Sequence, residues 1–582
     1  MQAHASLLLG IATALSQVSS VTAAPFNGST SPANCRYLPG DRQWPDPATW
    51  RILNDTVGGR LIAGEPLAKS CHGASYDADA YRDCALQKNS PLTFKTSFQD
   101  PVNVMSPYWL NNTCSPYTSQ NASCILGNIA SYAINVSSVS DVVAGLEFAR
   151  QNNVRLSIKN TGHDYIGRSN GEGSLALWTH NLKDITFFNY SSAVYTGPAA
   201  KVSAGVQFFE AYAAAASHGL RVVGGFCPTV GMAGGYVQGA GHGPLGATYG
   251  LAADNTLEFE VVTPDGRHVV ASRTENPDLY WALSGGGGGT YGIVLSLTTK
   301  AHPDGQVAGG SLAFDNTNEE SFWAAIEKWQ RHLLLLDQIP GFTTVWGFTN
   351  ASFSIAFATL PGGNASGVAD ALSPFLKELD NLGIVPSSYE TSDRSTFYEH
   401  YEHYTGDMPY GPYTTNDVIG GRLIQRPTIE HNATNLVAVL RDIVNSDLPS
   451  VRVNGIAANV THARAGNSPG DNAILPAWRE SLYWLNVDVL FDPASSVSDI
   501  HGIQAQVNQF QDRLRPLTPG GGAYMNEGTY DNVDWKTDYY GSNYDKLLQV
   551  KKTYDPDFLL YSHTPVGADE VTVASDGRIC KN

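Results

Sequence analysis

The sequence predicts an α+β protein made of two packed domains, and three observations lead to this fold class. The chain has 582 residues, several times the length that one hydrophobic core normally spans. Residues 130–158 follow the pattern of a strand, a helix and a second strand. After His302 the pattern changes to longer amphipathic helices and long strands, which indicates a second domain.

The first domain begins with a strand, a helix and a strand. Tyr132 to Val136 alternate in polarity, Ser140-Asp141 is typical of a helix start, and Val154 to Ile158 alternate again. The second strand runs directly into the loop Asn160–Ser169. The later elements are two strands, a helix and a hairpin turn, at Leu175–Trp178, Lys201–Gly205, Phe208–Ser217 and Pro264-Asp265-Gly266.

The second domain is also predicted to mix helices and strands. Val497–Arg513 has helical periodicity and leads to Gly520-Gly521-Gly522, which indicates a hinge back toward the first domain. The preceding elements are a helix, a strand pair, a helix and a long strand, at Glu319–Leu335, Phe342–Thr349, Ser352–Leu360, Ala369–Leu382 and Ser481–Phe491.

The charge balance argues against a nucleic-acid partner. Charged residues make up 15% of the chain, and 36 basic against 54 acidic side chains leave a formal net charge of −18. Phosphate binding needs a basic stripe, and the sequence contains none.

The first residues are typical of a secretory leader. Leu7–Leu15 is a short apolar stretch, and Val21-Thr22-Ala23 carries small residues where a signal peptidase cuts. We expect cleavage after Ala23 and a secreted protein without membrane spans, because no apolar stretch reaches ~20 residues. A secretory route also fits the Asn-x-Ser/Thr acceptors Asn27, Asn54, Asn111, Asn121, Asn135, Asn189, Asn350, Asn364, Asn432 and Asn459.

Seven cysteines in an oxidising compartment leave one thiol unpaired. Cys71 with Cys84 and Cys114 with Cys124 are close enough in sequence to pair locally. Cys35 and Cys580 could tie the two ends of the chain together. Cys227 is then the odd cysteine, and it lies in a glycine-rich stretch.

Two further motifs resemble a nucleotide-binding site and a metal site, but the residues around them do not support either function. Gly241–Gly246 and Gly287–Gly292 match Gly-x-Gly-x-x-Gly, but neither has the preceding strand and following helix that a Rossmann nucleotide site needs. His400 and His403 have the spacing of metal ligands on a helix, but no third ligand is near. We therefore expect a solvated helical face there and no metal.

Two loops carry the motifs on which the functional prediction depends. Their sequences are Gly162-His163-Asp164-Tyr165-Ile166-Gly167-Arg168-Ser169 and Gly225-Phe-Cys227-Pro-Thr-Val230-Gly231-Met-Ala-Gly234-Gly235. They resemble the two flavin-attachment segments of the vanillyl-alcohol oxidase family, in its berberine-bridge-enzyme-like branch. The resemblance covers Ala130 to about Pro556 and continues in order through Gly241–Leu245, Tyr249–Asn255, Asp278–Leu283, Gly285–Gly292, Tyr540–Leu547 and Tyr554–Pro556.

This resemblance implies FAD held by two covalent bonds. His163 would bond the flavin's 8α-methyl group and Cys227 its carbon 6, which uses the odd cysteine. Backbone amides of Asn160–Ser169 are expected to cradle the pyrophosphate. The residues expected to contact the cofactor are Asn160, Thr161, Gly162, Asp164, Gly167, Arg168, Ser169, Gly231, Gly234, Gly235, His242, Gly250, Leu251, Asp254, Asn255, Gly292, Val294, Tyr540 and Asn543.

Oxidation of an alcohol also needs a base near the flavin, because the hydroxyl loses a proton as the carbon loses a hydride. By the resemblance, the residue two after the linked His, Tyr165, points into the pocket. The segment Ala523–Glu527 would return over the flavin and offers Tyr524 and Glu527. The base is therefore Tyr165, Tyr524 or Glu527. A tyrosine would need a lowered pKa, whereas a glutamate needs only to be placed.

The substrate would be bulky, a carbohydrate or a secondary metabolite. The strand Tyr483–Val489 is expected to form the pocket floor, and its period of two puts Trp484, Asn486 and Asp488 on one face. The alternative for these three residues is an ordinary solvent-exposed sheet face.

One residue is expected to control oxygen reactivity. In the family, the residue three after the linked Cys is a gate beside the flavin, where a valine leaves space for dioxygen. Here it is Val230, which predicts an oxidase that makes hydrogen peroxide.

Together these expectations describe a secreted monomeric enzyme with a two-part FAD-binding domain and a substrate domain, in which helices cover an antiparallel sheet. The alternatives are a dehydrogenase that uses another electron acceptor, and a non-catalytic carbohydrate-binding glycoprotein. The expected divisions are 1–23 leader, 24–124 disulfide-linked extension, 125–302 FAD-binding domain, 303–520 substrate domain and 521–582 returning segment.

Overall fold

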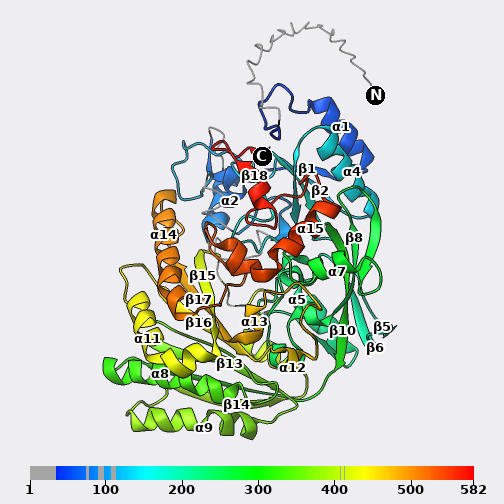
Figure 1. The fold of residues 1–582 in the computed structure, drawn as a ribbon. Helices are drawn as coiled ribbons and strands as arrows, with labels where there is room; N and C mark the ends of the chain where they lie inside the picture. Colours follow the sequence, from blue (N-terminus) through cyan, green and yellow to red (C-terminus); the bar gives the residue numbers. More distant parts are fainter. Residues whose placement is uncertain are drawn as a thin grey trace, which may run out of the picture.

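The structure is a computed structural model that describes residues 34–73, 78–89, 98–105, 113–406, 408–411, 413 and 415–582. The expected leader and the acceptors Asn27 and Asn111 lie outside these residues. Helices and largely antiparallel sheets are mixed along the chain, which confirms the α+β class (Figure 1).

A four-stranded sheet forms the start of the first domain. Its order is β1-β2-β4-β3, with β2, β4 and β3 parallel to one another. Helix α4 packs against β3 and β4, so the predicted strand, helix and strand are confirmed. The bounds are β1 Leu61–Ala63, β2 Tyr132–Asn135, α4 Val139–Gln151, β3 Arg155–Lys159 and β4 Ser174–Trp178.

A second, antiparallel sheet completes this region in the order β5-β6-β10-β8-β9, with β7 paired to β10. The predicted hairpin turn joins β8 to β9. The bounds are β5 Ile185–Ser191, β6 Thr196–Ser203, α5 Phe208–Ser217, β7 Leu220–Val222, α6 Gly246–Tyr249, β8 Thr256–Val262, β9 His268–Ser272, α7 Pro277–Leu283 and β10 Ile293–Pro303.

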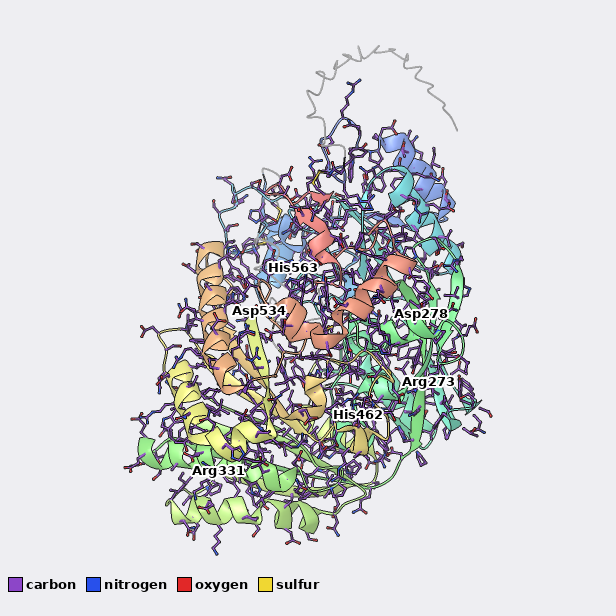
Figure 2. The ribbon with its side chains drawn as sticks, in the orientation of Figure 1. Arg273, Asp278, Arg331, His462, Asp534 and His563 are labelled. Carbon is purple, nitrogen blue, oxygen red and sulfur yellow. A yellow bond between two sulfur atoms is a disulfide. The ribbon has the colours of Figure 1, made fainter. Side chains whose placement is uncertain are left out.

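The second domain is built on a seven-stranded antiparallel sheet, β14-β11-β13-β12-β16-β17-β15. Helices α8, α9, α11 and α14 form a layer on its outer side, at the lower left of Figure 1. Arg331 of α8 lies in this layer, where it pairs with Glu327 (Figure 2). The bounds are β11 Val307–Asp315, α8 Glu319–Leu336, β12 Thr343–Phe348, β13 Ser352–Pro361, α9 Ala365–Asn381, β14 Ser388–Arg394, α10 Phe397–Thr405, β15 Asp417–Gln425, α11 Arg426–Val444, β16 Val451–Ala458, α12 His462–Ala465, α13 Ala477–Glu480, β17 Ser481–Leu490 and α14 Val497–Leu514.

The two faces of β17 belong to different cores. Tyr483, Leu485 and Val487 pack in the core beneath the outer helices. Trp484, on the other face, belongs to the core of the first domain and is fully buried. The face that carries Trp484, Asn486 and Asp488 is therefore turned toward the first domain, which excludes the solvent-exposed alternative.

The expectation of a solvated helical face at His400 was wrong. His400 is buried on α10, and its Nε2 lies 2.9 Å from Thr359 Oγ1. Gly309 makes room for it, since a Cβ there would lie 2.8 Å from His400 Cε1. His403 instead pairs with Glu390, so the two histidines bind different partners.

The C-terminal segment returns to the first domain. Tyr554 at the end of α15 donates a hydrogen bond to Asp278 of α7, which is labelled in Figure 2. Disulfides join Cys35 to Cys580, Cys71 to Cys84 and Cys114 to Cys124, as the sequence suggested, and Cys227 is free. The remaining bounds are α1 Pro47–Thr56, α2 Ala78–Asn89, α15 Tyr544–Tyr554, β18 Val571–Val573 and β19 Ile579–Lys581.

Candidate active site

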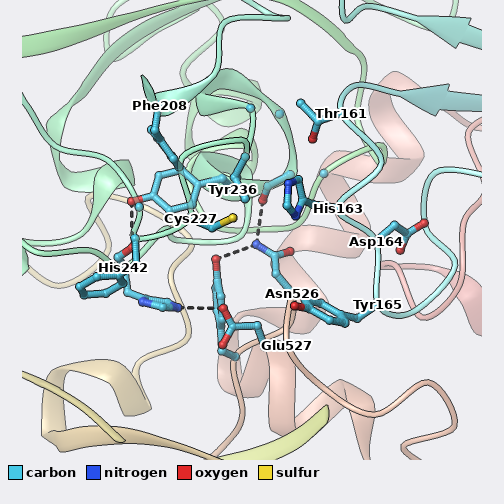
Figure 3. A pocket seen from close by; sticks show the side chains of 18 of the residues that line it. Thr161, His163, Asp164, Tyr165, Phe208, Cys227, Tyr236, His242, Asn526 and Glu527 are labelled. Atoms are coloured by element: carbon cyan, nitrogen blue, oxygen red, sulfur yellow. Dashed lines mark hydrogen bonds and ion pairs between the residues drawn. The ribbon is translucent and has the colours of Figure 1, made fainter. Parts of the chain in front are cut away.

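A cavity of about 650 Å³ lies between the first domain and the seven-stranded sheet. His163 and Cys227 line one side, and Asn486 and Asp488 of β17 line another. Glu527 of the C-terminal segment also faces this cavity (Figure 3). Residues far apart in sequence therefore meet around one cavity.

The loop Asn160–Ser169 is held in shape by the carboxylate of Asp164. The backbone N–H groups of Ile166, Arg168 and Ser169 donate to it at 3.2, 3.0 and 2.8 Å, and the Ser169 hydroxyl donates at 2.7 Å. These three amides are thus engaged within the loop, so they are not free to cradle a pyrophosphate.

His163 and Cys227 share one neighbour, Thr229. Its Oγ1 lies 2.7 Å from His163 Nε2 and 3.6 Å from Cys227 Sγ. Burial, with a smaller contribution from the positive charge of Lys159, lowers the pKa of His163 to about 3. Burial also raises the pKa of Cys227 to about 12, although hydrogen bonds from Thr229 and Val230 oppose this shift. Both side chains are therefore neutral at pH 7.

Glycines bring the backbone to the surface of this side of the cavity. A Cβ at Gly231 or Gly234 would lie 2.9 Å from Asn160 Nδ2, and one at Gly288 would lie 2.8 Å from Gly235 Cα. Larger side chains would fill this space. The wall can therefore accept a flat, bulky group at close range.

Several buried polar atoms in the wall have no hydrogen-bond partner among the described residues. They are Asn160 Oδ1, Arg168 Nη1, Gln238 Oε1 and His242 Nδ1. A buried polar group without a partner is costly, so such atoms indicate a polar ligand that completes the site. Donors, acceptors, one guanidinium and a glycine surface together fit FAD, which is flat, polar and phosphorylated.

Glu527 is an acidic residue of the cavity wall. His242 Nε2 lies 3.1 Å from its Oε1 (Figure 3). Trp484 Nε1 donates to its Oε2 at 2.8 Å. Burial opposes ionisation, but attraction to His242 and hydrogen bonds from His242, Trp484 and Asn486 outweigh it and lower the pKa of Glu527. Glu527 is thus held as a carboxylate.

The two candidate tyrosines differ from Glu527 in charge state. Burial raises the pKa of both Tyr165 and Tyr524, and the negative charge of Glu527 raises both further. Asn526 Nδ2 donates to the Tyr524 hydroxyl at 2.8 Å. Neither phenol has the lowered pKa that a tyrosine base would need.

The sheet wall crowds carboxyl groups together. Asp488 of β17 faces Asp417 of β15, and Arg452 Nε of β16 is 4.0 Å from Asp488 Oδ2. Burial, followed by repulsion from Asp417, raises the pKa of Asp488, while Arg452 opposes the shift. Asp488 Oδ1 is buried with no partner among the described residues.

Comparison with known proteins agrees with this site. Residues 130–272 match the family described as FAD binding domain, and residues 523–567 match the family described as Berberine and berberine like. The VAO-type flavoprotein oxidase VAO615 of Thermothelomyces thermophilus is 41% identical to 99% of this chain, over 100% of its own length. The chain belongs to the vanillyl-alcohol oxidase family. It is an FAD-dependent oxidoreductase of the berberine-bridge-enzyme-like branch.

Other relatives of this flavoprotein agree in fold or sequence. The crystal structure of VAO-type MtVAO615 from Myceliophthora thermophila C1 has a TM-score of 0.89 at 40% identity, over 94% of this chain and 100% of that one. The bifunctional decalin synthase calF of Penicillium decumbens is 42% identical over 94% of this chain and 96% of its own. A structure described as 6-S-cysteinyl, 8α-N1-histidyl FAD in the glucooligosaccharide oxidase of Acremonium strictum shares the fold alone, with a TM-score of 0.60 at 20% identity, over 75% of this chain and 91% of that one.

Some of the residues predicted to contact FAD do not line the cavity. Asp254 instead receives two hydrogen bonds from Arg479, at 2.9 and 2.8 Å. The Tyr540 hydroxyl donates to Thr564 O at 3.0 Å, and Asn543 Nδ2 donates to Ala473 O at 3.1 Å. The predicted residues outside the wall are Gly167, Gly250, Leu251, Asp254, Asn255, Tyr540 and Asn543.

The other predicted residues line the wall, apart from Trp484, which reaches it through Glu527. Sequence reasoning missed Thr229, Asp417, Arg452 and Asn454. Thr229 lies within the quoted motif, and its place two residues after Cys227 was a usable signal. Asp417, Arg452 and Asn454 lie on strands β15 and β16, which the sequence analysis did not identify.

Proposed function

We propose that this flavoprotein is a secreted oxidase of an alcohol group on a bulky substrate, with FAD bonded to His163 and Cys227. The observation that carries the proposal is a single cavity in which both attachment residues, a carboxylate and a polar sheet wall face one another. The remaining space suits a carbohydrate or a secondary metabolite.

Glu527 is proposed as the base. When bound, FAD accepts a hydride equivalent from the substrate carbon and passes the electrons on to dioxygen. Glu527 takes the hydroxyl proton, because its carboxylate is ionised while the phenols of Tyr165 and Tyr524 are not. His242 and Trp484 fix the orientation of Glu527, since each holds one of its oxygens.

The sheet wall orients the substrate. Asn454 Nδ2 donates to Asn486 Oδ1 at 3.1 Å, so the two amides lie side by side on β16 and β17. Together with Asp488 and Arg452 they offer both donors and acceptors toward the cavity. Hydroxyl or carbonyl groups of a substrate would pair with them, which suits polar, uncharged molecules.

Cys227 and Val230 support the oxidase assignment. Cys227 is the only free cysteine of the seven, and it faces the cavity together with His163. Val230 also lines the cavity, where its short side chain would leave room for dioxygen. A dehydrogenase that uses another acceptor is the alternative.

A secretory route is supported by two further features. Three disulfides are typical of an oxidising compartment. None of the glycosylation acceptors in the described part of the chain is buried. As a separate observation, none of the described helices is long and apolar enough to cross a bilayer.

A substrate screen tests the proposed function. The protein is mixed without oxygen with oligosaccharides and with hydroxylated secondary metabolites, and loss of the flavin's visible absorption reports reduction. Air is then admitted and hydrogen peroxide is measured. We expect bleaching by at least one alcohol, followed by rapid recovery with peroxide. Reduced flavin that persists in air would support the dehydrogenase.

A further inference from the structure

Thr229 occupies a fixed position between the two attachment residues. It is fully buried, and its backbone carbonyl accepts a hydrogen bond from Gln207 Nε2 at 2.6 Å. The carbonyls on either side, of Pro228 and Val230, accept from the first turn of α5 at 3.0 and 3.2 Å. The hydroxyl is therefore held on a rigid backbone.

This hydroxyl contacts both nucleophiles. The distance from Thr229 Oγ1 is 2.7 Å to His163 Nε2 and 3.6 Å to Cys227 Sγ. A hydroxyl can accept one hydrogen bond and donate another at the same time. One side chain can therefore fix the protonation pattern of the imidazole and the thiol together.

We infer that Thr229 is a positioning residue that prepares His163 Nδ1 and Cys227 Sγ to form the two flavin bonds. The inference rests on the double attachment proposed above. Nε2–H of His163 donates to Thr229 Oγ1, which leaves the lone pair of Nδ1 as the nucleophile. The Thr229 O–H donates to Cys227 Sγ.

The donation to sulfur matters because a thiolate, not a thiol, is the nucleophile. Burial raises the pKa of the Cys227 thiol, and hydrogen bonds from Thr229 and Val230 oppose that shift. Removing the Thr229 hydroxyl would therefore leave the thiol harder to ionise. It would also remove the contact that Thr229 makes with His163 Nε2.

The chemistry balances with dioxygen as oxidant. Each new bond replaces one carbon–hydrogen bond of the flavin and one hydrogen on the nucleophile. These hydrogens leave as two protons, and the electron pair passes to dioxygen, which becomes hydrogen peroxide. For His163 the departing proton is the one on Nε2, which donates to Thr229 Oγ1 until the bond at Nδ1 has formed. It is then released as one of the two protons that end on hydrogen peroxide.

Four variants test the inference. Thr229→Val keeps the shape of the side chain but removes the hydroxyl, Thr229→Ala removes it without any risk of crowding, and Thr229→Ser restores it. Thr263→Val is the matched control, because Thr263 is as fully buried as Thr229, but its hydroxyl bonds Asp265 and the backbone of Arg267 in the β8–β9 turn instead of the attachment residues. Each protein is produced under riboflavin limitation, so that it is isolated before flavin attaches, and is then loaded with FAD in air. Samples are precipitated with acid over time.

Two readouts are independent of enzyme activity: the fraction of bound flavin that stays in the pellet, and the masses of the peptides that contain His163 and Cys227. We expect Thr229→Val and Thr229→Ala to form the bonds about tenfold more slowly or worse. Thr229→Ser and Thr263→Val should match the parent. Normalising to bound flavin separates slow bonding from weak folding.

Two results would count against the inference in different ways. Equal rates in Thr229→Val, Thr229→Ala and the parent would overturn it and leave the proposed double attachment intact. A parent protein whose flavin stays in the supernatant would contradict the double attachment and the inference together.

Discussion

The two walls of the cavity are built in different ways. The attachment wall comes from two short stretches, Asn160–Ser169 and Cys227–Gly235, whose shape is fixed by local contacts such as those of Asp164. The sheet wall comes from β15, β16 and β17, where pairing register decides which side chains meet. Local sequence thus specifies the first wall, and long-range pairing specifies the second.

The walls also differ in charge. His163 and Cys227 are both kept neutral by burial. Asp417, Asp488 and Glu527 by contrast repel one another across the sheet wall, and Arg452 opposes only part of that repulsion. We therefore expect substitutions in the attachment wall to alter how the flavin is bonded and reoxidised. Substitutions of Glu527 or in the sheet wall should instead alter proton transfer and the dependence of the enzyme on pH.

The largest expected effect is on proton transfer. Glu527→Gln keeps the size of the side chain but removes its charge, so flavin reduction by substrate should slow by ~10²–10⁴-fold. Acid-stable flavin should be unchanged, because the hydrogen bonds of Glu527 to His242 and Trp484 hold it in another part of the wall. Anaerobic stopped-flow measures the rate.

Tyr165→Phe and Tyr524→Phe are the matched comparisons for this prediction. If either slows reduction as much as expected while Glu527→Gln does not, then the base is that tyrosine and the assignment of Glu527 is wrong.

The next effect concerns oxygen at the attachment wall. Val230→Leu adds one methylene to the cavity wall, and overpacking costs roughly 1–3 kcal/mol, which corresponds to about 5- to 150-fold in rate. Flavin reoxidation should slow by this factor, whereas reduction should change little. Stopped-flow measurement of the two half-reactions decides it, with Val230→Ala as the variant that opens space. Equal slowing of both half-reactions would make Val230 a packing residue only.

The smallest effect is on stability and pH. Because the pKa of Asp488 is raised in the folded protein, the native state binds more protons than the unfolded state above the ordinary Asp pKa. The free energy of unfolding therefore falls as the pH rises from the ordinary Asp pKa toward the raised pKa of Asp488. Asp488→Asn has no carboxyl group to ionise and so avoids this loss of stability. The melting temperature of the variant minus that of the parent should therefore increase by about 1–3 °C from pH 4 to pH 8.

Asn486→Ala on the same strand face should show no such trend, since it has no titrating group. An advantage of Asp488→Asn that stays constant with pH would mean that Asp488 is not protonated in the folded protein.

The contrast between locally specified elements and elements that depend on long-range strand pairing also explains which parts of the fold could be predicted from the sequence. α5 was predicted at its observed bounds, because its apolar face repeats with helical period and its start is polar. β15 was missed because Gly420 and Gly421 interrupt its strand pattern. Gly421 is needed there, since a Cβ would lie 2.1 Å from Leu485 O and 2.8 Å from the Trp484 ring.

β16 was missed for a different reason. Its residues alternate between buried and partly buried positions, which was a usable signal, but Asn454-Gly455 in its centre is typical of a turn. Gly455 is required because a Cβ would lie 2.1 Å from the Trp346 ring, an approach that only the folded structure reveals. Asp417, Arg452 and Asn454 could not be placed in the site without these two strands.

The most direct test of the account is a peptide map of the intact protein digested without reduction. One FAD should join the peptide that contains His163 to the peptide that contains Cys227, at the 8α-methyl and carbon 6 of the flavin. Cys227→Ala should then leave FAD on the His163 peptide alone, with a changed absorption spectrum. Recovery of an unmodified Cys227 peptide from the flavin-loaded parent would contradict the account.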